Sequence, residues 1–114
     1  MGSSPKMGTS PSQIRVLTVD DHPLILEGVG ALIASQRDMR LVAEASNGRE
    51  AVEQFRSHRP DITLMDLQMP DMSGIDAIIA IRSEFPDARI IVIREGTVAH
   101  AYKGQQTTLF PRLD

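Results

Sequence analysis

Hydrophobic residues in this chain form short continuous runs that alternate with segments in which apolar residues recur every three or four positions. The continuous runs are typical of parallel strands covered on both faces, and the spaced pattern is typical of amphipathic helices. Pro23 and the turn signal Asn47-Gly48 suit the starts of two helices. The alternation therefore favours an α/β fold with right-handed crossovers. It predicts strands at 14–19, 39–45, 61–66 and 90–93, and helices at 23–36, 48–58 and about 74–85.

The two ends of the chain depart from this alternation. Residues 1–13 are rich in Ser, Gly and Pro, and we expect them to be a disordered leader or an expression scar outside the fold. Residues 14–93 form the predicted core, and residues 94–114 form an aberrant tail. A short strand or a turn of helix is predicted in the tail from four apolar residues: Val98, Ala99, Ala101 and Tyr102.

Composition narrows the classes of function. The 114 residues are enough for one small domain, whose core must be aliphatic because only 4% of the residues are aromatic. The lack of cysteine excludes disulfides, thiolate zinc sites and cysteine nucleophiles, and it suits a reducing cytoplasm. A formal charge of −3 argues against direct nucleic-acid binding, and no apolar run approaches the length of a membrane span. We therefore expect a cytoplasmic protein that binds neither nucleic acid nor membrane.

Three acidic residues stand at the ends of two predicted strands. Asp20 and Asp21 follow the strand 14–19, and Asp66 ends the strand 61–66. In a flavodoxin-like doubly wound parallel sheet of strand order 2-1-3-4, these strands are neighbours where the strand order reverses, which is where such sheets bind ligands. Each acid alone is equally well explained as a strand-ending or capping residue. Together, three neighbouring carboxylates require a neutralising cation, and their oxygens favour Mg²⁺; a carboxylate there is able to attack a phosphoryl group.

Two motifs around these acids resemble a known family. The first is Val19-Asp20-Asp21-His22-Pro23, and the second is Met65-Asp66-Leu67-Gln68-Met69-Pro70-Asp71-Met72-Ser73-Gly74. Together they resemble the receiver domain of bacterial two-component response regulators, in the subgroup whose receivers precede a LuxR-type helix-turn-helix domain. The resemblance covers about residues 14–93.

This resemblance implies a role for each acid. It implies that Asp66 accepts a phosphoryl group from a sensor histidine kinase, in a module that is not an enzyme beyond slow autodephosphorylation. It also implies that Mg²⁺ is the cofactor. Asp20, Asp21 and Asp66 would bind the ion together with the backbone carbonyl of Gln68.

The tail departs from the family pattern. The family carries Thr or Ser at the end of the fourth strand, where this chain has Arg94, and a Lys at the end of a fifth strand. Thr97 and Lys103 are the candidates for these two phosphoryl contacts. Residues 94–114 are too few for a helix, a fifth strand and a final helix. We therefore expect the fifth strand and the last helices to be missing or aberrant through truncation, deletion or scrambling, and switching to be impaired.

The shortened tail also bears on assembly. Without a fifth strand, the strand 90–93 presents a bare edge, which invites pairing with another chain. We therefore expect either a homodimer, formed through this sheet edge or by strand exchange, or an aggregation-prone monomer.

Alternative interpretations remain for the function and for one residue. A phosphorylation-independent interaction or dimerisation module fits the loss of the Thr or Ser. A phosphatase of the haloacid dehalogenase type also uses an Asp nucleophile with Mg²⁺, but Asp66-Leu67-Gln68 lacks the second acid of that family's Asp-x-Asp motif. His22 is interpreted as a helix-start residue beside Pro23, with a contact to the acids as the alternative.

Overall fold

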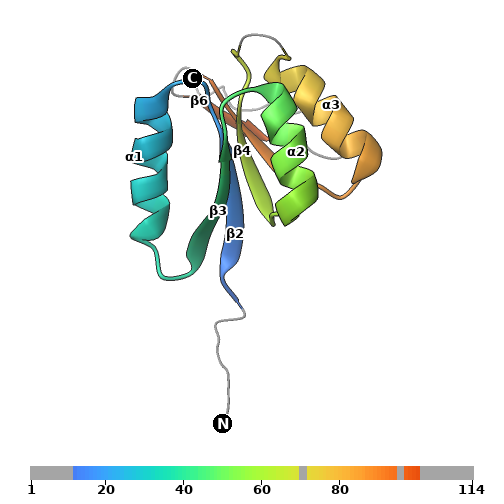
Figure 1. The fold of residues 1–114 in the computed structure, drawn as a ribbon. Helices are drawn as coiled ribbons and strands as arrows, with labels where there is room; N and C mark the ends of the chain where they lie inside the picture. Colours follow the sequence, from blue (N-terminus) through green and yellow to red (C-terminus); the bar gives the residue numbers. More distant parts are fainter. Residues whose placement is uncertain (1–11, 70–71, 95–96, 101–114) are drawn as a thin grey trace.

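A five-stranded sheet with helices on both faces makes up the part of the chain that the computed structural model describes, residues 12–69, 72–94 and 97–100. The order of the strands across the sheet is β3-β2-β4-β5-β6. Figure 1 shows the arrangement. The strands are β2 (Ile14–Val19), β3 (Met39–Ala45), β4 (Ile62–Asp66), β5 (Ile90–Arg94) and β6 (Thr97–His100), and the helices are α1 (Pro23–Ala34), α2 (Gly48–His58) and α3 (Gly74–Glu84).

The first four strands confirm the predicted topology. β2 pairs with β3 and β4, and β4 pairs with β5, all in parallel, which is the order 2-1-3-4. The helices agree with the prediction to within two residues. α1 ends at Ala34, earlier than expected, because the chain then tightens into a turn in which the Gln36 N–H donates to the carbonyl of Ile33 at 3.0 Å.

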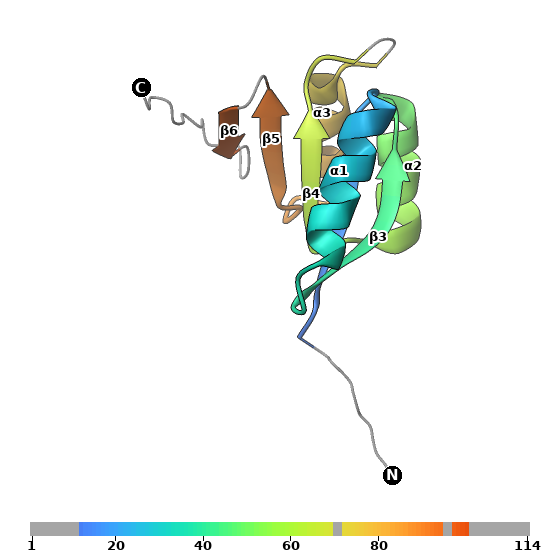
Figure 2. The ribbon, with the colours of Figure 1, turned by 90° about the vertical axis from the view of Figure 1, so that its left-hand side faces the viewer.

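The helices divide unequally between the two faces of the sheet. Figure 2 shows α1 alone in front of the sheet and α2 with α3 behind it. The larger core lies between the sheet and the α2–α3 pair, where Leu17, Met65 and Ile81 are almost completely buried. Burial of such aliphatic side chains contributes about 1.5–3 kcal/mol each. This core fixes the relative positions of β2 and β4, the two strands whose ends carry the acids.

The prediction that β5, the fourth strand along the chain, has a bare edge was wrong. β6 runs antiparallel to β5 and pairs with it, from Arg94 opposite Thr97 to Ile91 opposite His100. β6 therefore covers the edge of β5 that was expected to stay open for lack of a fifth strand. Of the two alternatives predicted for Val98 and Ala99, a short strand or a turn of helix, the structure has the strand. Its antiparallel direction makes the fifth strand of this sheet aberrant for an otherwise parallel fold.

Several predictions concern residues that the structure does not describe. Most of the leader 1–13 and the tail from residue 101 onward, including Ala101, Tyr102 and Lys103, lie outside the described residues. Within the described part of the chain, none of the helices combines the length and apolar character that crossing a membrane requires.

Candidate acidic metal site

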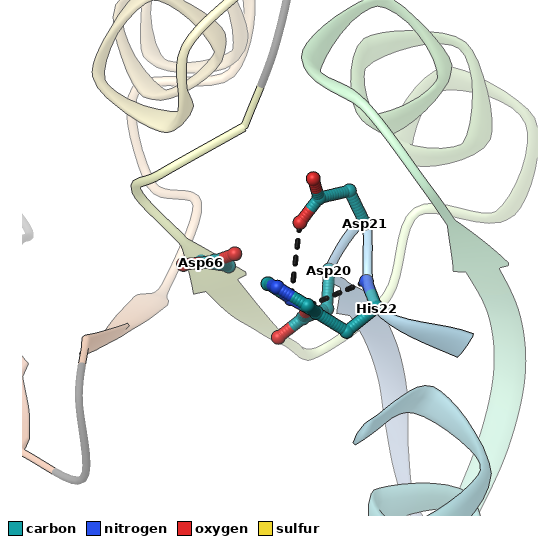
Figure 3. A group of neighbouring side chains, drawn as sticks. All are labelled: Asp20, Asp21, His22 and Asp66. Carbon is teal, nitrogen blue, oxygen red and sulfur yellow. Dashed lines mark hydrogen bonds and ion pairs between the residues drawn. The ribbon is translucent and has the colours of Figure 1, made fainter. Parts of the chain in front are cut away.

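The three predicted acids converge at one edge of the sheet. Asp20 and Asp21 directly follow β2, and Asp66 is the last residue of β4. The two strands are paired in parallel with Val19 opposite Met65, so the next residues along each strand emerge side by side. One carboxylate oxygen of each acid and a ring nitrogen of His22 all lie within 4.8 Å of one another. Figure 3 shows this cluster.

Asp66 is the most enclosed member of the cluster. Only 8% of its surface is exposed. Burial is the main cause that raises the pKa of Asp66, and the charges of Asp20 and Asp21 raise the pKa further. The Gln68 backbone N–H, which donates to Asp66 Oδ1 at 3.1 Å, lowers the pKa and offsets part of this rise. Among the described residues, Oδ1 is the Asp66 oxygen that accepts a hydrogen bond, so the second oxygen remains available for chemistry.

His22 joins the two acids that follow β2. Its backbone carbonyl accepts the N–H groups of Ile25 and Leu26, so it begins α1 as predicted. Its Nδ1 lies 2.7 Å from Asp20 Oδ1 and 3.1 Å from Asp21 Oδ1. The hydrogen bond to Asp20, followed by the charge of Asp21, raises the pKa of the His22 imidazole. The helix-start role and the contact with the acids, which were alternatives in the sequence, therefore coexist.

Within the described residues, one buried oxygen of Asp21 accepts no hydrogen bond and has only the ion pair with His22. Asp21 Oδ1 is buried and makes no hydrogen bond within the described residues. His22 Nδ1 lies near it, but that nitrogen carries a single hydrogen and is already within 2.7 Å of Asp20 Oδ1. A buried carboxylate oxygen without a donor is unfavourable. A cation placed among the three acids would supply its missing partner.

The donor set is suited to a hard divalent cation. Carboxylate oxygens from Asp20, Asp21 and Asp66 are the ligands that Mg²⁺ prefers, and Mg²⁺ commonly takes one or two carboxylates plus other oxygens. The imidazole of His22 is the one nitrogen donor in the cluster, and it suits metals such as Zn²⁺ or Ni²⁺ better than Mg²⁺. The residues present therefore fit Mg²⁺ binding through their oxygens.

Gly74, at the far end of the loop after β4, lies against the backbone at the start of that loop. Gly74, the first residue of α3, lies so close to the loop start that a Cβ there would be 2.4 Å from the carbonyl oxygen of Asp66 and 2.7 Å from Cα of Leu67. The Gly74 N–H also donates to the Leu67 carbonyl at 3.3 Å. Ser73 caps the start of α3, and its hydroxyl accepts the Asp76 N–H at 3.2 Å. Residue 68, whose carbonyl is a predicted ligand, directly follows Leu67, which accepts the Gly74 hydrogen bond.

The structure does not test the two candidates for phosphoryl contact, Thr97 and Lys103. Thr97 is the first residue of β6 and lies opposite Arg94 in the hairpin, so it belongs to a different strand from any of the acids. Lys103 lies outside the described residues. Both assignments stay predictions.

Comparison with known proteins points in the same direction as the geometry. Residues 16–107 match the family described as the response regulator receiver domain. The response regulator protein VraR of Staphylococcus aureus is 35% identical over 80 residues, which are 70% of this chain and 38% of VraR. The chain therefore spans about 38% of the length of the curated relatives that it matches.

Solved structures show the same fold. A two-component response regulator of the LuxR family from Aurantimonas sp. SI85-9A1 is 40% identical with a TM-score of 0.70, over 73% of this chain and 59% of that one. A chain of the CheX–CheY–BeF₃–Mg²⁺ complex from Borrelia burgdorferi is 30% identical with a TM-score of 0.66, over 71% of this chain and 61% of that one.

Proposed function

Because this chain belongs to the response regulator receiver domain family, whose members accept phosphoryl groups in two-component signalling, we propose that Asp66 is its phosphorylation site. The observation that carries the proposal is the convergence of Asp66 with Asp20 and Asp21, with oxygens of all three within 4.8 Å. Asp66 is the acid that projects from the middle of the sheet, and it is the most buried of the three.

The reaction assigned to Asp66 is attack by a carboxylate oxygen on phosphorus. A bond forms between that oxygen and the phosphorus, and the bond between the phosphorus and the donor breaks, so that the product is an acyl phosphate. The Gln68 N–H holds Asp66 Oδ1 and orients the carboxylate. This leaves the second oxygen as the attacking atom.

We assign the Mg²⁺ ligands to Asp20, Asp21, Asp66 and the backbone carbonyl of Gln68. When bound, the ion would neutralise the clustered carboxylates and the charge on the phosphoryl oxygens. Asp21 Oδ1, which is buried without a hydrogen bond in the described residues, supports this assignment. On metal binding, the imidazole of His22 would give up its contacts with Asp20 and Asp21.

The donor in this proposal is a sensor histidine kinase, and the chain acts as its substrate. Receiver domains are generally signalling modules, and we expect no turnover beyond slow loss of the phosphoryl group. Thr97 and Lys103 are proposed as its phosphoryl contacts, and impaired switching follows if neither fills that role. CheX is the partner of CheY in the complex from Borrelia burgdorferi, and we do not propose it as a partner of this chain.

A second candidate function is a phosphorylation-independent interaction module. The observation that favours it is Arg94 at the end of β5, where the family carries a hydroxyl residue. In this case the acids would remain, but Asp66 would accept no phosphoryl group. The two functions differ in whether the chain accepts a phosphoryl group at all.

Intact mass spectrometry after treatment with acetyl phosphate and Mg²⁺ separates the two. We expect the mass of the wild-type chain to rise by one phosphoryl group and the Asp66→Asn variant to show no increase. Asp87→Asn, which changes an exposed turn residue, serves as the matched control and should be labelled like the wild type. A wild-type chain that stays unlabelled while it is folded would refute the phosphoacceptor function and favour the interaction module.

A further inference from the structure

We infer that Gly48 is a positioning residue for the acidic site, although it lies on α2 and carries no ligand. The inference rests on the proposed function of Asp66, because it concerns the geometry of that same site. Because residue 48 has no side chain, Met72 can lie close to the start of α2. The loop after β4 can then adopt the position in which Gln68 lies beside Asp66.

The first observation is a lack of space at Gly48. A Cβ built on this buried residue would lie 2.5 Å from the carbonyl oxygen of Met72, and 2.7 and 2.8 Å from Cγ and Cβ of Met72. Two of these three atoms belong to the backbone or its first side-chain carbon, so rotation of the methionine cannot relieve the contact. Gly48 does not adopt the left-handed φ that favours glycine. Close approach of Met72 therefore explains the glycine, and backbone conformation does not.

The second observation is that the start of α2 is held in place. The side chain of Asn47 accepts the Glu50 N–H at 2.8 Å. The Glu50 carboxylate in turn accepts the N–H and the hydroxyl of Ser46 at 2.8 and 2.9 Å. These bonds tie the first turn of α2 to the end of β3. When residue 48 is enlarged, the loop that contains Met72 has to move, because the helix start is fixed.

The third observation connects Met72 to the acid. Met72 is followed by Ser73 and Gly74, and Gly74 lies against the backbone of Asp66, with a virtual Cβ 2.4 Å from the Asp66 carbonyl oxygen. The Gly74 N–H donates to Leu67 at 3.3 Å. A displacement at Met72 is therefore passed to the peptide groups at the start of the loop. α2 and α3 also pack side by side on the same face of the sheet (Figure 1), which leaves the start of α3 little freedom to absorb the shift.

Gly48→Ala tests this inference directly. We expect the Mg²⁺ dissociation constant, measured by isothermal titration calorimetry, to rise about tenfold or more, in line with the effect of misplaced supporting residues at metal sites. The matched control is Gly28→Ala on α1. A Cβ at Gly28 would meet nothing within 4 Å, so this variant should bind Mg²⁺ like the wild type.

Urea unfolding of the same proteins separates positioning from stability alone. A purely structural role would lower the free energy of unfolding of Gly48→Ala but leave the Mg²⁺ affinity of its folded form unchanged, and that result would overturn the inference. Wild-type protein that binds no Mg²⁺ would instead refute the proposed function, and the inference would fall with it. These two failures differ because only the second is visible in the wild type.

A measurement on the wild type covers the case in which Gly48→Ala does not fold. In a ¹⁵N-correlation NMR titration with Mg²⁺, the amide resonances of Gly48 and Met72 should shift together with that of Gln68, while that of Gly28 stays in place. Resonances of Gly48 and Met72 that remain unmoved while Gln68 shifts would show that α2 is not coupled to the site, and this would overturn the inference.

Discussion

Asp66→Asn should make the fold more stable in the absence of Mg²⁺, although it removes the residue proposed to carry the function. The carboxylate of Asp66 is buried beside two other acids, and burial raises its pKa. An asparagine oxygen keeps the ability to accept the Gln68 N–H, which donates at 3.1 Å in the wild type. The substitution therefore removes charge repulsion and desolvation without removing the hydrogen bond.

The magnitude follows from the separation of the charges. Two unit charges about 4.8 Å apart, the upper limit of separation in this cluster, repel by about 1 kcal/mol in water and about 3.5 kcal/mol at an effective dielectric constant of 20. Asp66 makes two such pairs, with Asp20 and Asp21, and the imidazole of His22 offsets part of the repulsion. We expect a net gain of about 1–3 kcal/mol, which corresponds to about 4–8 °C in Tm for each kcal/mol.

Urea unfolding at pH 7 in the presence of a chelator measures this gain. Asp87→Asn is the control, because its exposed turn position predicts a change within about 0.5 kcal/mol. Addition of Mg²⁺ should reduce this difference or reverse it: at 100 times its dissociation constant, the ion stabilises the wild type by about 2.7 kcal/mol, and Asp66→Asn by less. A variant that is less stable than the wild type without Mg²⁺ would show that the acids do not repel one another in the folded state.

Three further predictions concern other parts of the molecule. Gly74→Ala should cost about 1–3 kcal/mol in the free energy of unfolding, since its Cβ would lie 2.4 Å from the Asp66 carbonyl oxygen; no loss in urea unfolding would contradict that contact. Glu50→Gln should lower stability by about 0.5–1 kcal/mol at pH 7, because the Ser46 bonds lower the pKa of Glu50. The wild type should lose this stability as the pH falls below about 4.5, where Glu50 takes up a proton, and an equal deficit at pH 3 would refute the assignment. Homodimerisation by strand exchange predicts twice the monomer mass in light scattering after size exclusion, and a monodisperse monomer at high concentration would exclude it.

The parallel part of the fold was predictable because its signals are local. Each of the first four strands and three helices has its own apolar period, and the motifs at Asp20-Asp21 and Asp66 stand directly at strand ends. Since parallel strands bring their carboxyl ends to one edge, the meeting of these acids follows from the strand order. The resemblance then indicated the chemistry, for which periodicity alone has no signal.

The hairpin at the end of the sheet was harder to predict. A short apolar segment such as β6 suits a strand of either direction, and its pairing with β5 depends on the turn between them. The expectation of a bare edge followed from the length of residues 94–114, which are too few for the helix, fifth strand and final helix of the family pattern. Val98 and Ala99 indicated a strand only as one of two alternatives.

Gly48 had a local signal that concealed its role. The pair Asn47-Gly48 indicates a turn before α2, and Asn47 does cap that helix. The glycine is explained by the close approach of Met72, which leaves no room for a Cβ at residue 48. Met72 is distant in sequence and belongs to another loop. Contacts of this kind between elements have no signature in one sequence, because they depend on how two helices pack against the same sheet.

Chemical mapping of the phosphorylated residue tests the central claim most directly. The full chain is treated with acetyl phosphate and Mg²⁺, reduced with borohydride, which converts an aspartyl phosphate to homoserine, and digested for tandem mass spectrometry. We expect homoserine at position 66 and unchanged aspartate at positions 20 and 21. Homoserine at either of those two positions, with Asp66 intact, would contradict it.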